Sequence, residues 1–437
     1  MTYVDSASVL INDTAHTEFA LPSPIKQPDS AHDKAEWSLA TRIAFRFVFA
    51  YFVLYAFPYQ APLERVVPWL GSHILHLSHT ITVFPNGSGD TTYNYVEVLC
   101  FLAVAAVAAL TWSLLDRKRA KYERLFQWLR LGIRLVLGMT MLGYGAAKVM
   151  QGQMPAPSLS RLLQPYGESS PMGLLWTFIG ASGPYQIFCG ASEMLGGILL
   201  FVPWLTALGS LVCVGVLTNV FVLNMCYDVP VKLFSLHLLL MAVFLAAPDL
   251  RKLADLFIFQ RPARLSHPVP LFRRRWLNRT VLAVQLLCGV ALASVTLYFS
   301  HQQAKEMAVK PPYYGIWSVE EYAVDGNPQP LVLTNATRWR RVLLDSPERL
   351  SVQPIDGPQE RFMLKLDQSK KSFTLTKRAD PNWKADFYYR DGEKDVLLLE
   401  GELDSHKVSA KLHRVNESEV LLTSRGFHWI NEYPFNR

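Results

Sequence analysis

The stretch PYQIFCGASEMLGGILLFVP, from Pro184 to Pro203, decides the class of this protein. Its length matches a membrane span, because about 20 mostly apolar residues cross the hydrocarbon core of a bilayer. One carboxylate, Glu193, lies at its centre. A charged side chain there costs roughly 2.5 to 3.5 kcal/mol, so it is expected to face a partner or a cavity rather than lipid. The stretch therefore predicts either a functional site inside a membrane or a buried ion pair that locks two helices together.

About seven apolar runs of this length follow one another along the 437 residues. They cover residues 38–57, 95–115, 128–150, 184–203, 205–224, 229–247 and 278–298. A soluble helical core could contain one such run, but seven in succession predict an α-helical polytopic membrane bundle. We assign this transmembrane domain to residues 36–300. The polar residues 1–35 are expected to form a disordered cytoplasmic tail, with the first span acting as its own insertion signal.

Lysine and arginine are concentrated in alternate linkers, and such an excess marks the cytoplasmic side of a membrane protein. Six basic residues lie in 116–130 and seven lie in 251–275, whereas 58–94 and 151–183 contain one each. This alternation predicts a cytoplasmic N-terminus and an exported C-terminal region, in an inner or plasma membrane. It also accounts for the net charge of +7, so we predict no binding of nucleic acid.

Cysteine and histidine patterns give little support to redox-dithiol or metal chemistry. All five cysteines lie in or beside predicted spans, and no C-x-x-C motif occurs. His73, His76 and His79 are spaced three apart, which could place three metal ligands on one strip of a helix. The spacing drifts around the helix and no carboxylate lies among them, so we favour an interfacial helix and predict no metal. In the next loop, Asp90 or Thr91 is expected to cap a helix.

Several polar side chains of the bundle are expected to converge on the outer half of the bilayer, if depth is counted at 1.5 Å per residue. The residues assigned to catalysis are Glu193, His237 and Lys148, and those assigned to binding a cofactor or ligand are Arg46, Asn219, Asp228 and Lys232. His237 can also be read as a satisfied core residue, and Lys148 as an anchor at the interface. Asp228 and Lys232 lie four residues apart, and we predict an ion pair at the rim.

The span at 128–150 carries an ordered stripe of basic residues and glycines. Steps of four and three residues place them on one helix face, and the glycines allow another helix to approach closely. The stripe comprises Arg130, Arg134, Gly138, Met141, Gly145 and Lys148. A Glu193 paired with a lysine or arginine would stay ionised, whereas a Glu193 that faces a quinone or a lipid could be protonated. The sequence leaves both states open.

Residues 128–250 resemble the DoxX-like membrane family. The resemblance rests on the glycine-rich helix LGMTMLGYGAAKVM with its basic residue, on EMLGGILLF, and on YDVPVKLFSLHLLLMAVFLAAPD. In that family four-helix units are implicated in redox-linked membrane processes, including a thiosulfate and quinone oxidoreductase subunit. The resemblance implies a quinone-like or lipid-like ligand near Glu193 and Lys148. The extra spans and the large C-terminal region depart from the family, so the identity of a substrate does not transfer.

Residues 311–437 change to an alternation of apolar and polar residues. Segments such as GIWSVEEYAV, KSFTLTK, HKVSAKLHRV and EVLLTS, separated by turns, predict eight to ten strands in an all-β barrel or sandwich. Gly315 and Trp317 resemble the opening motif of lipocalin-like barrels, and we expect Arg425 to pack over that Trp. The aromatic tail from Arg425 onward is expected to pack on the barrel, or to dock the domain onto the bundle.

Three functions follow from these patterns. The first is a redox-linked component or accessory factor, such as a quinone-linked oxidoreductase subunit, that binds a quinone-like or lipophilic ligand in the outer half of the bundle. The second is a membrane-anchored module that binds a lipid or a partner protein through its exported β-domain. The third is a proton-coupled transporter with Glu193 as proton carrier, which the lack of a clear inverted repeat disfavours.

Overall fold

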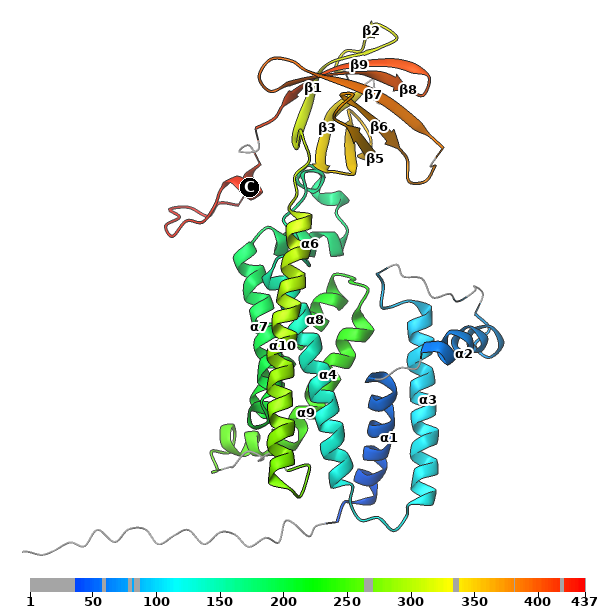
Figure 1. Cartoon of the computed structure of the whole chain (residues 1–437), viewed down its shortest axis with the longest axis vertical. Helices are drawn as coiled ribbons and strands as arrows, with labels where there is room; N and C mark the ends of the chain where they lie inside the picture. Colours follow the sequence, from blue (N-terminus) through cyan, green and yellow to red (C-terminus); the bar gives the residue numbers. More distant parts are fainter. Residues whose placement is uncertain are drawn as a thin grey trace, which may run out of the picture.

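The computed structural model describes residues 36–56, 60–77, 81, 87–262, 270–332, 338–380, 382–416 and 420–436. The predicted tail at 1–35 and His79 lie outside these residues. Helices form an elongated bundle, and a β-barrel lies at one end of it (Figure 1). We call this end of the bundle the barrel end.

Among the described residues, the bundle contains seven long helices. They are α1 (Leu39–Ala56), α3 (Thr92–Leu115), α4 (Glu123–Val149), α7 (Gly183–Phe201), α8 (Thr206–Cys226), α9 (Lys232–Phe257) and α10 (Arg275–Met307). Three shorter helices lie between them: α2 (Gln60–His73), α5 (Leu159–Leu162) and α6 (Pro171–Gly180). α10 runs the length of the bundle and leads directly into the barrel (Figure 1).

Six of the long helices are long and apolar enough to cross a membrane, and α7 is the exception. α7 has 19 residues and packs along α4, but Gln186, Glu193 and its glycines dilute its apolar character. By length and composition alone, six of the seven expected spans qualify, and α7 runs along α4 as a further helix of the bundle. The polar residues that lower the hydropathy of α7 are buried against other helices, so they do not face lipid.

Glycines bring the backbones of α4 and α7 into contact. A Cβ atom added to Gly145 would lie 2.7 Å from the carbonyl oxygen of Gly190, and one added to Gly197 would lie 3.0 Å from the carbonyl oxygen of Gly138. Any larger side chain at these positions would push the helices apart. The predicted glycine face of α4 is thus the face on which α7 packs.

The C-terminal region is a closed antiparallel barrel of eight strands, which decides between the predicted barrel and sandwich. The strands are β1 (Gly315–Val324), β3 (Trp339–Ser346), β4 (Arg349–Pro354), β5 (Glu360–Asp367), β6 (Ser372–Thr376), β7 (Lys384–Asp391), β8 (Val396–Leu403) and β9 (His406–Arg414). Pairing of β1 with β9 closes the barrel, and the short β2 (Asn327–Pro328) extends β1 beyond it.

The predicted strand EVLLTS is wrong. Leu421–Ser424 forms a short helix, α11, because closure of the barrel leaves no free strand edge to which another strand could add. The following residues run to the side of the barrel (Figure 1), and Phe427, Trp429 and Tyr433 are exposed. The tail therefore covers neither the barrel nor the bundle.

Large side chains fill the barrel. Trp339, Phe373 and Phe387 belong to one buried cluster that spans the interior, and the remaining cavity measures about 20 Å³. That volume is close to the space that one water molecule needs. The part of the barrel interior around Phe373 therefore has no room for a lipid or a quinone, whereas an open pocket of about 440 Å³ lies beside Tyr322 and Arg338.

The residue that lies beside Trp317 is Arg414, not Arg425. Arg414 is the cross-strand neighbour of Trp317, whereas Arg425 stacks on Phe435 within the tail. The indole N–H of Trp317 donates to the carbonyl of Tyr313 at 2.9 Å. Burial, with a hydrogen bond to a neighbouring aspartate, raises the pKa of Tyr313 to about 12, so its hydroxyl stays protonated and donates.

The barrel contacts the bundle through α5. Ser160 donates a hydrogen bond to Asp345 of β3 at 3.2 Å, and Gln359 donates to the Ser160 carbonyl at 3.2 Å. Beside them, Leu159 of α5 packs in a buried cluster with Ile316 and Leu343 of the barrel. A short loop helix thus joins the two parts by both apolar and polar contacts.

Candidate functional site

A pocket of about 460 Å³ lies between α4, α6, α7, α8 and the first turns of α9, toward the barrel end of the bundle. Its volume falls within the range of pockets that bind small ligands, roughly 300 to 1,000 Å³. The walls are mainly aliphatic and aromatic, with Met141, Trp176, Leu223 and Phe234 among them. Such walls suit a lipophilic molecule.

One buried ion pair lies in this apolar wall. The Lys148 ammonium donates to both carboxylate oxygens of Glu193, at 2.7 and 2.8 Å. The two side chains are only 9% and 5% exposed, so each charge relies on the other for compensation. The pair exists because the glycine contacts between α4 and α7 bring Lys148, in the last turn of α4, beside the middle of α7.

A few further polar groups line the same pocket. Asn219 of α8 is one of the predicted ligand-binding residues, and it lies in the wall. Tyr144, Ser192 and Cys189 also lie there, although they are not among the predicted site residues. Tyr144 stands one turn before Lys148, whose ammonium lies 5.8 Å from the centre of the Tyr144 ring. That spacing of four residues on one helix face is a signal from which Tyr144 could have been found.

His237 is not part of this pocket. Its Nδ1 lies 2.6 Å from the carbonyl of Leu233, so Nδ1 carries a proton and Nε2 accepts from the hydroxyl of Tyr51 at 2.5 Å. The imidazole is also stacked on Tyr55, with ring centres 4.0 Å apart. The structure thus places His237 on the side of α9 that faces α1, where its hydrogen bonds are satisfied within the core.

Arg46 lies at the other end of the bundle from Lys148. Its guanidinium donates to Tyr122, Ser113 and the carbonyl of Asp116, around the turn between α3 and α4. That turn precedes α4, and Lys148 lies in the last turn of this helix of 27 residues, about 40 Å long at 1.5 Å per residue. The structure does not bring Arg46 to Glu193.

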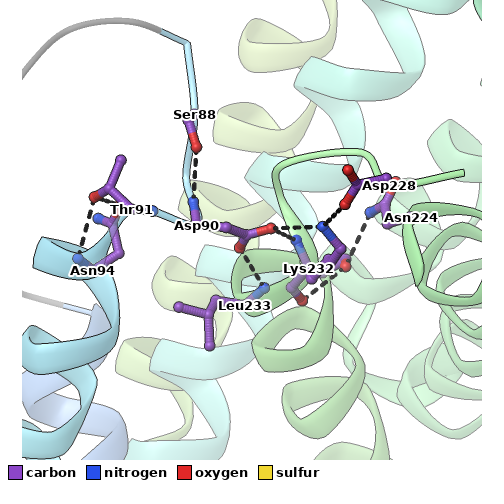
Figure 2. Close-up of polar contacts among 9 residues, drawn as sticks. Ser88, Asp90, Thr91, Asn94, Asn224, Asp228, Lys232 and Leu233 are labelled. Carbon is purple, nitrogen blue, oxygen red and sulfur yellow. Dashed lines mark hydrogen bonds and ion pairs between the residues drawn. The ribbon is translucent and has the colours of Figure 1, made fainter. Parts of the chain in front are cut away.

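Asp228 and Lys232 form the predicted rim pair, at 2.7 Å (Figure 2). Lys232 also approaches Asp90, at 3.8 Å. Asp90 accepts hydrogen bonds from the backbone N–H groups of Lys232 and Leu233, at 2.7 and 2.9 Å, and so caps the start of α9 from a distant loop (Figure 2). Its neighbour Thr91 caps α3. The predicted cap of α3 is therefore Thr91, and Asp90 caps α9 instead.

Of the three histidines considered as metal ligands, the structure describes His73, at the end of α2, and His76, just after it. The ring of His73 stacks on Trp69 and both side chains are solvent-exposed, as is His76. Within the residues that the structure describes, no group of three or more histidine, cysteine or acidic side chains is placed to hold a metal ion. The exposed apolar residues Val66, Trp69 and Ile74 are consistent with a helix at a membrane interface.

The fold and this pocket define a class: a bundle of membrane-span helices that encloses an apolar pocket with a buried lysine and glutamate, and that carries a C-terminal β-barrel. The sequence matches no known family profile, and no solved structure matches it. The uncharacterized protein YwoB of Bacillus subtilis (strain 168) is 32% identical over 133 residues, which is 28% of this chain and 79% of that protein. The chain belongs to the same family as YwoB.

Proposed function

We propose that this chain is an integral membrane protein that binds a quinone-like or other lipophilic ligand in the pocket between α4 and α9, as a redox-linked component or accessory factor. The observation that carries the proposal is the buried pair of Lys148 and Glu193 in an otherwise apolar pocket of about 460 Å³. An ammonium beside a carboxylate offers both a donor and an acceptor to a carbonyl or hydroxyl head group. The apolar wall offers a place for a ring or an isoprenoid chain.

The resemblance of residues 128–250 to the DoxX-like family supports the redox assignment. The charge pattern of the linkers supports an orientation with the N-terminus in the cytoplasm and the barrel exported. The eight-stranded barrel with Trp317 in its first strand supports a lipocalin-like domain, although large side chains fill much of its interior. We therefore assign ligand binding to the helical pocket rather than to the barrel.

The test is mass spectrometry of the full-length protein, purified in mild detergent, with extraction of the lipophilic molecules that accompany it. We expect a quinone or a similar neutral lipid in the wild type and its loss in Glu193→Gln and in Lys148→Met. Asp228→Asn is the matched control, because it alters a rim charge outside the pocket wall. Wild-type protein with bulk phospholipid alone, or an equal amount of ligand in Glu193→Gln, would refute the proposal.

A second candidate function is binding of a partner protein by the β-domain. The observation that favours it is the exposed aromatic tail, in which Phe427, Trp429 and Tyr433 are 77%, 90% and 84% exposed. Large aromatic residues are enriched in protein interfaces. A photo-crosslinking residue at position 429, compared with one at the exposed Tyr388 of β7, should give a discrete adduct only from the tail.

A further inference from the structure

The pocket opens toward lipid between α7 and α8. The two helices touch where Gly196 meets Cys213, near the turn that joins them. Farther toward the barrel end, residues of both helices line the pocket and are also exposed: Phe188 of α7 at 66%, and Gly215 and Asn219 of α8. Residues that belong at once to the wall and to the outer surface mark an opening, and we call this opening the portal.

The surface around the portal is apolar and suits contact with the acyl chains of a bilayer. On α7, the exposed Leu195 lies two turns beyond Phe188, on the same face. On α8, Leu211 and Val222 are exposed on either side of Gly215. Because these apolar residues flank the portal, a molecule dissolved in the bilayer reaches the pocket without passing through water.

Asn219 stands out among the polar residues of this face. Ser192 donates to the carbonyl of Phe188 at 2.9 Å, and Thr218 donates to the carbonyl of Val214 at 2.7 Å, so both hydroxyls are satisfied within their own helix. The Asn219 amide makes no hydrogen bond to any residue that the structure describes. An amide left without a partner in an apolar surrounding is costly, so a molecule in the portal that bonded to it would be stabilised.

The charge of the pocket selects among lipophilic molecules. Lys148 and Glu193 neutralise each other, so the pocket wall holds no unpaired charge that could compensate an ionised head group. A carboxylate or phosphate that entered would compete with Glu193 for the one ammonium, and one of the two anions would be left buried and unpaired. An uncharged head group with carbonyl or hydroxyl oxygens avoids this cost.

We propose that the portal between α7 and α8 admits a membrane-dissolved ligand with an uncharged, hydrogen-bonding head group, and that Asn219 bonds to this head group on its way to Lys148 and Glu193. The inference rests on the proposed function, since it names the route and the chemical class of the ligand of the same pocket. It assigns to Asn219 a role in ligand selection rather than in stability.

The experiment is native mass spectrometry of the full-length protein in lipid nanodiscs, titrated with decylubiquinone or with palmitate. Gly215→Phe places a ring in the portal, where an added Cβ has no neighbour within 4 Å. Gly143→Phe is its matched control, because Gly143 of α4 is equally free of neighbours and does not line the pocket. Asn219→Leu is compared with Thr218→Val on the adjacent position, outside the wall.

We expect the wild type to bind decylubiquinone at least tenfold more tightly than palmitate. Gly215→Phe and Asn219→Leu should each weaken decylubiquinone binding at least fivefold without a change in melting temperature, and both controls should bind as the wild type does. Equal binding of palmitate would overturn the selection for an uncharged head group. Unchanged binding in both portal variants would overturn the route, and if Gly215→Phe fails to fold, Asn219→Leu alone decides it.

The same titration separates this inference from the proposed function. If the wild type binds no decylubiquinone, or if Glu193→Gln binds it equally well, the proposed function itself fails. If Glu193→Gln loses binding while the two portal variants keep it, the pocket stands and only the portal is wrong.

Discussion

Lys148 and Glu193 depend on each other because both are almost completely buried. Removal of one partner leaves the other charge in an apolar surrounding, which typically costs 3 to 5 kcal/mol, roughly the stability contribution of several core contacts. Replacement of both by apolar residues of similar volume is often close to neutral. A comparison of the single replacements with the double replacement therefore tests whether the pair is needed for stability or for ligand binding.

The first prediction concerns this pair. Lys148→Met and Glu193→Gln should each lower the melting temperature clearly, whereas the double variant Lys148→Met with Glu193→Leu should recover most of the loss. Thermal unfolding of the purified protein in detergent measures all three. If the double variant is stable but no longer carries the ligand, the pair serves binding; additive losses in the double variant would argue against mutual compensation.

The second prediction concerns Asp90. Asp90→Ala removes a carboxylate from two backbone N–H groups at the positive end of a long helix, so we expect a loss of about 1 to 2 kcal/mol. Asp228→Asn is the control, since it removes the charge of an exposed partner of the same lysine, suits the left-handed backbone of residue 228, and exposed ion pairs contribute little. Equal effects of the two variants in thermal unfolding would contradict a capping role for Asp90.

For individual residues, the sequence predicted only part of the site. Glu193 and Lys148 were selected because an intramembrane acid requires compensation, and the glycine stripe placed Lys148 on a packing face. His237 lies at a suitable position along α9 but faces α1, because depth along a helix does not fix the direction of a side chain. The capping of α9 by Asp90 joins residues 142 apart and carries no local pattern.

The contact between α4 and α7 depends on small residues, as its packing geometry shows. A Cβ atom added to Gly190 would lie 2.6 Å from the carbonyl oxygen of Gly145 and 2.7 Å from the Cβ of Lys148. Real Cβ atoms do not approach other atoms so closely, so one helix has to move. Because Lys148 and Glu193 stand on these two helices, movement also changes their hydrogen bonds.

The third prediction tests this contact. Gly190→Ala and Gly145→Ala should each cost about 1 to 3 kcal/mol by overpacking, and both should reduce ligand retention in the purified protein. Gly143→Ala, two residues from Gly145 on the same helix but with open space around an added Cβ, should be neutral. A destabilisation by Gly143→Ala as large as that by Gly145→Ala would contradict a packing origin, because helix propensity alone favours Ala over Gly.

The sequence predicted the helices and strands better than it predicted the contacts between them. Apolar runs gave the long helices, and alternation gave most strands, because these patterns follow from the local geometry of the backbone. The segment at 419–424 has the composition of a strand but lacks a neighbouring edge, which only closure of the barrel decides. β4 was not predicted, because it contributes only Leu350 and Val352 to the alternation and ends at Pro354, a residue that disfavours a strand.

For the whole molecule, the arrangement of helices places the N-terminal end of α1 and the barrel at opposite ends of the bundle (Figure 1). The described parts of the basic linkers, 116–130, 251–262 and 270–275, lie at the end away from the barrel, as an orientation with the barrel exported requires. The arrangement agrees with the alternation of charge, and a bilayer around the six apolar helices would separate the two ends.

The fourth prediction tests this orientation. In a bacterial host, alkaline phosphatase fused after residue 436 should be active, because the enzyme folds only outside the cytoplasm. The same enzyme fused after residue 119, in the basic linker, should be inactive. An inactive C-terminal fusion, together with an active fusion at residue 119, would reverse the orientation.

The capping of α9 by Asp90 has a consequence for biosynthesis. A ribosome that adds roughly 5 to 20 residues per second releases Leu233 some 7 to 30 seconds after Asp90. The acceptor is therefore in place before its two donors leave the exit tunnel. If this contact forms as α9 leaves the ribosome, Asp90→Ala should slow membrane assembly even where the finished protein tolerates it.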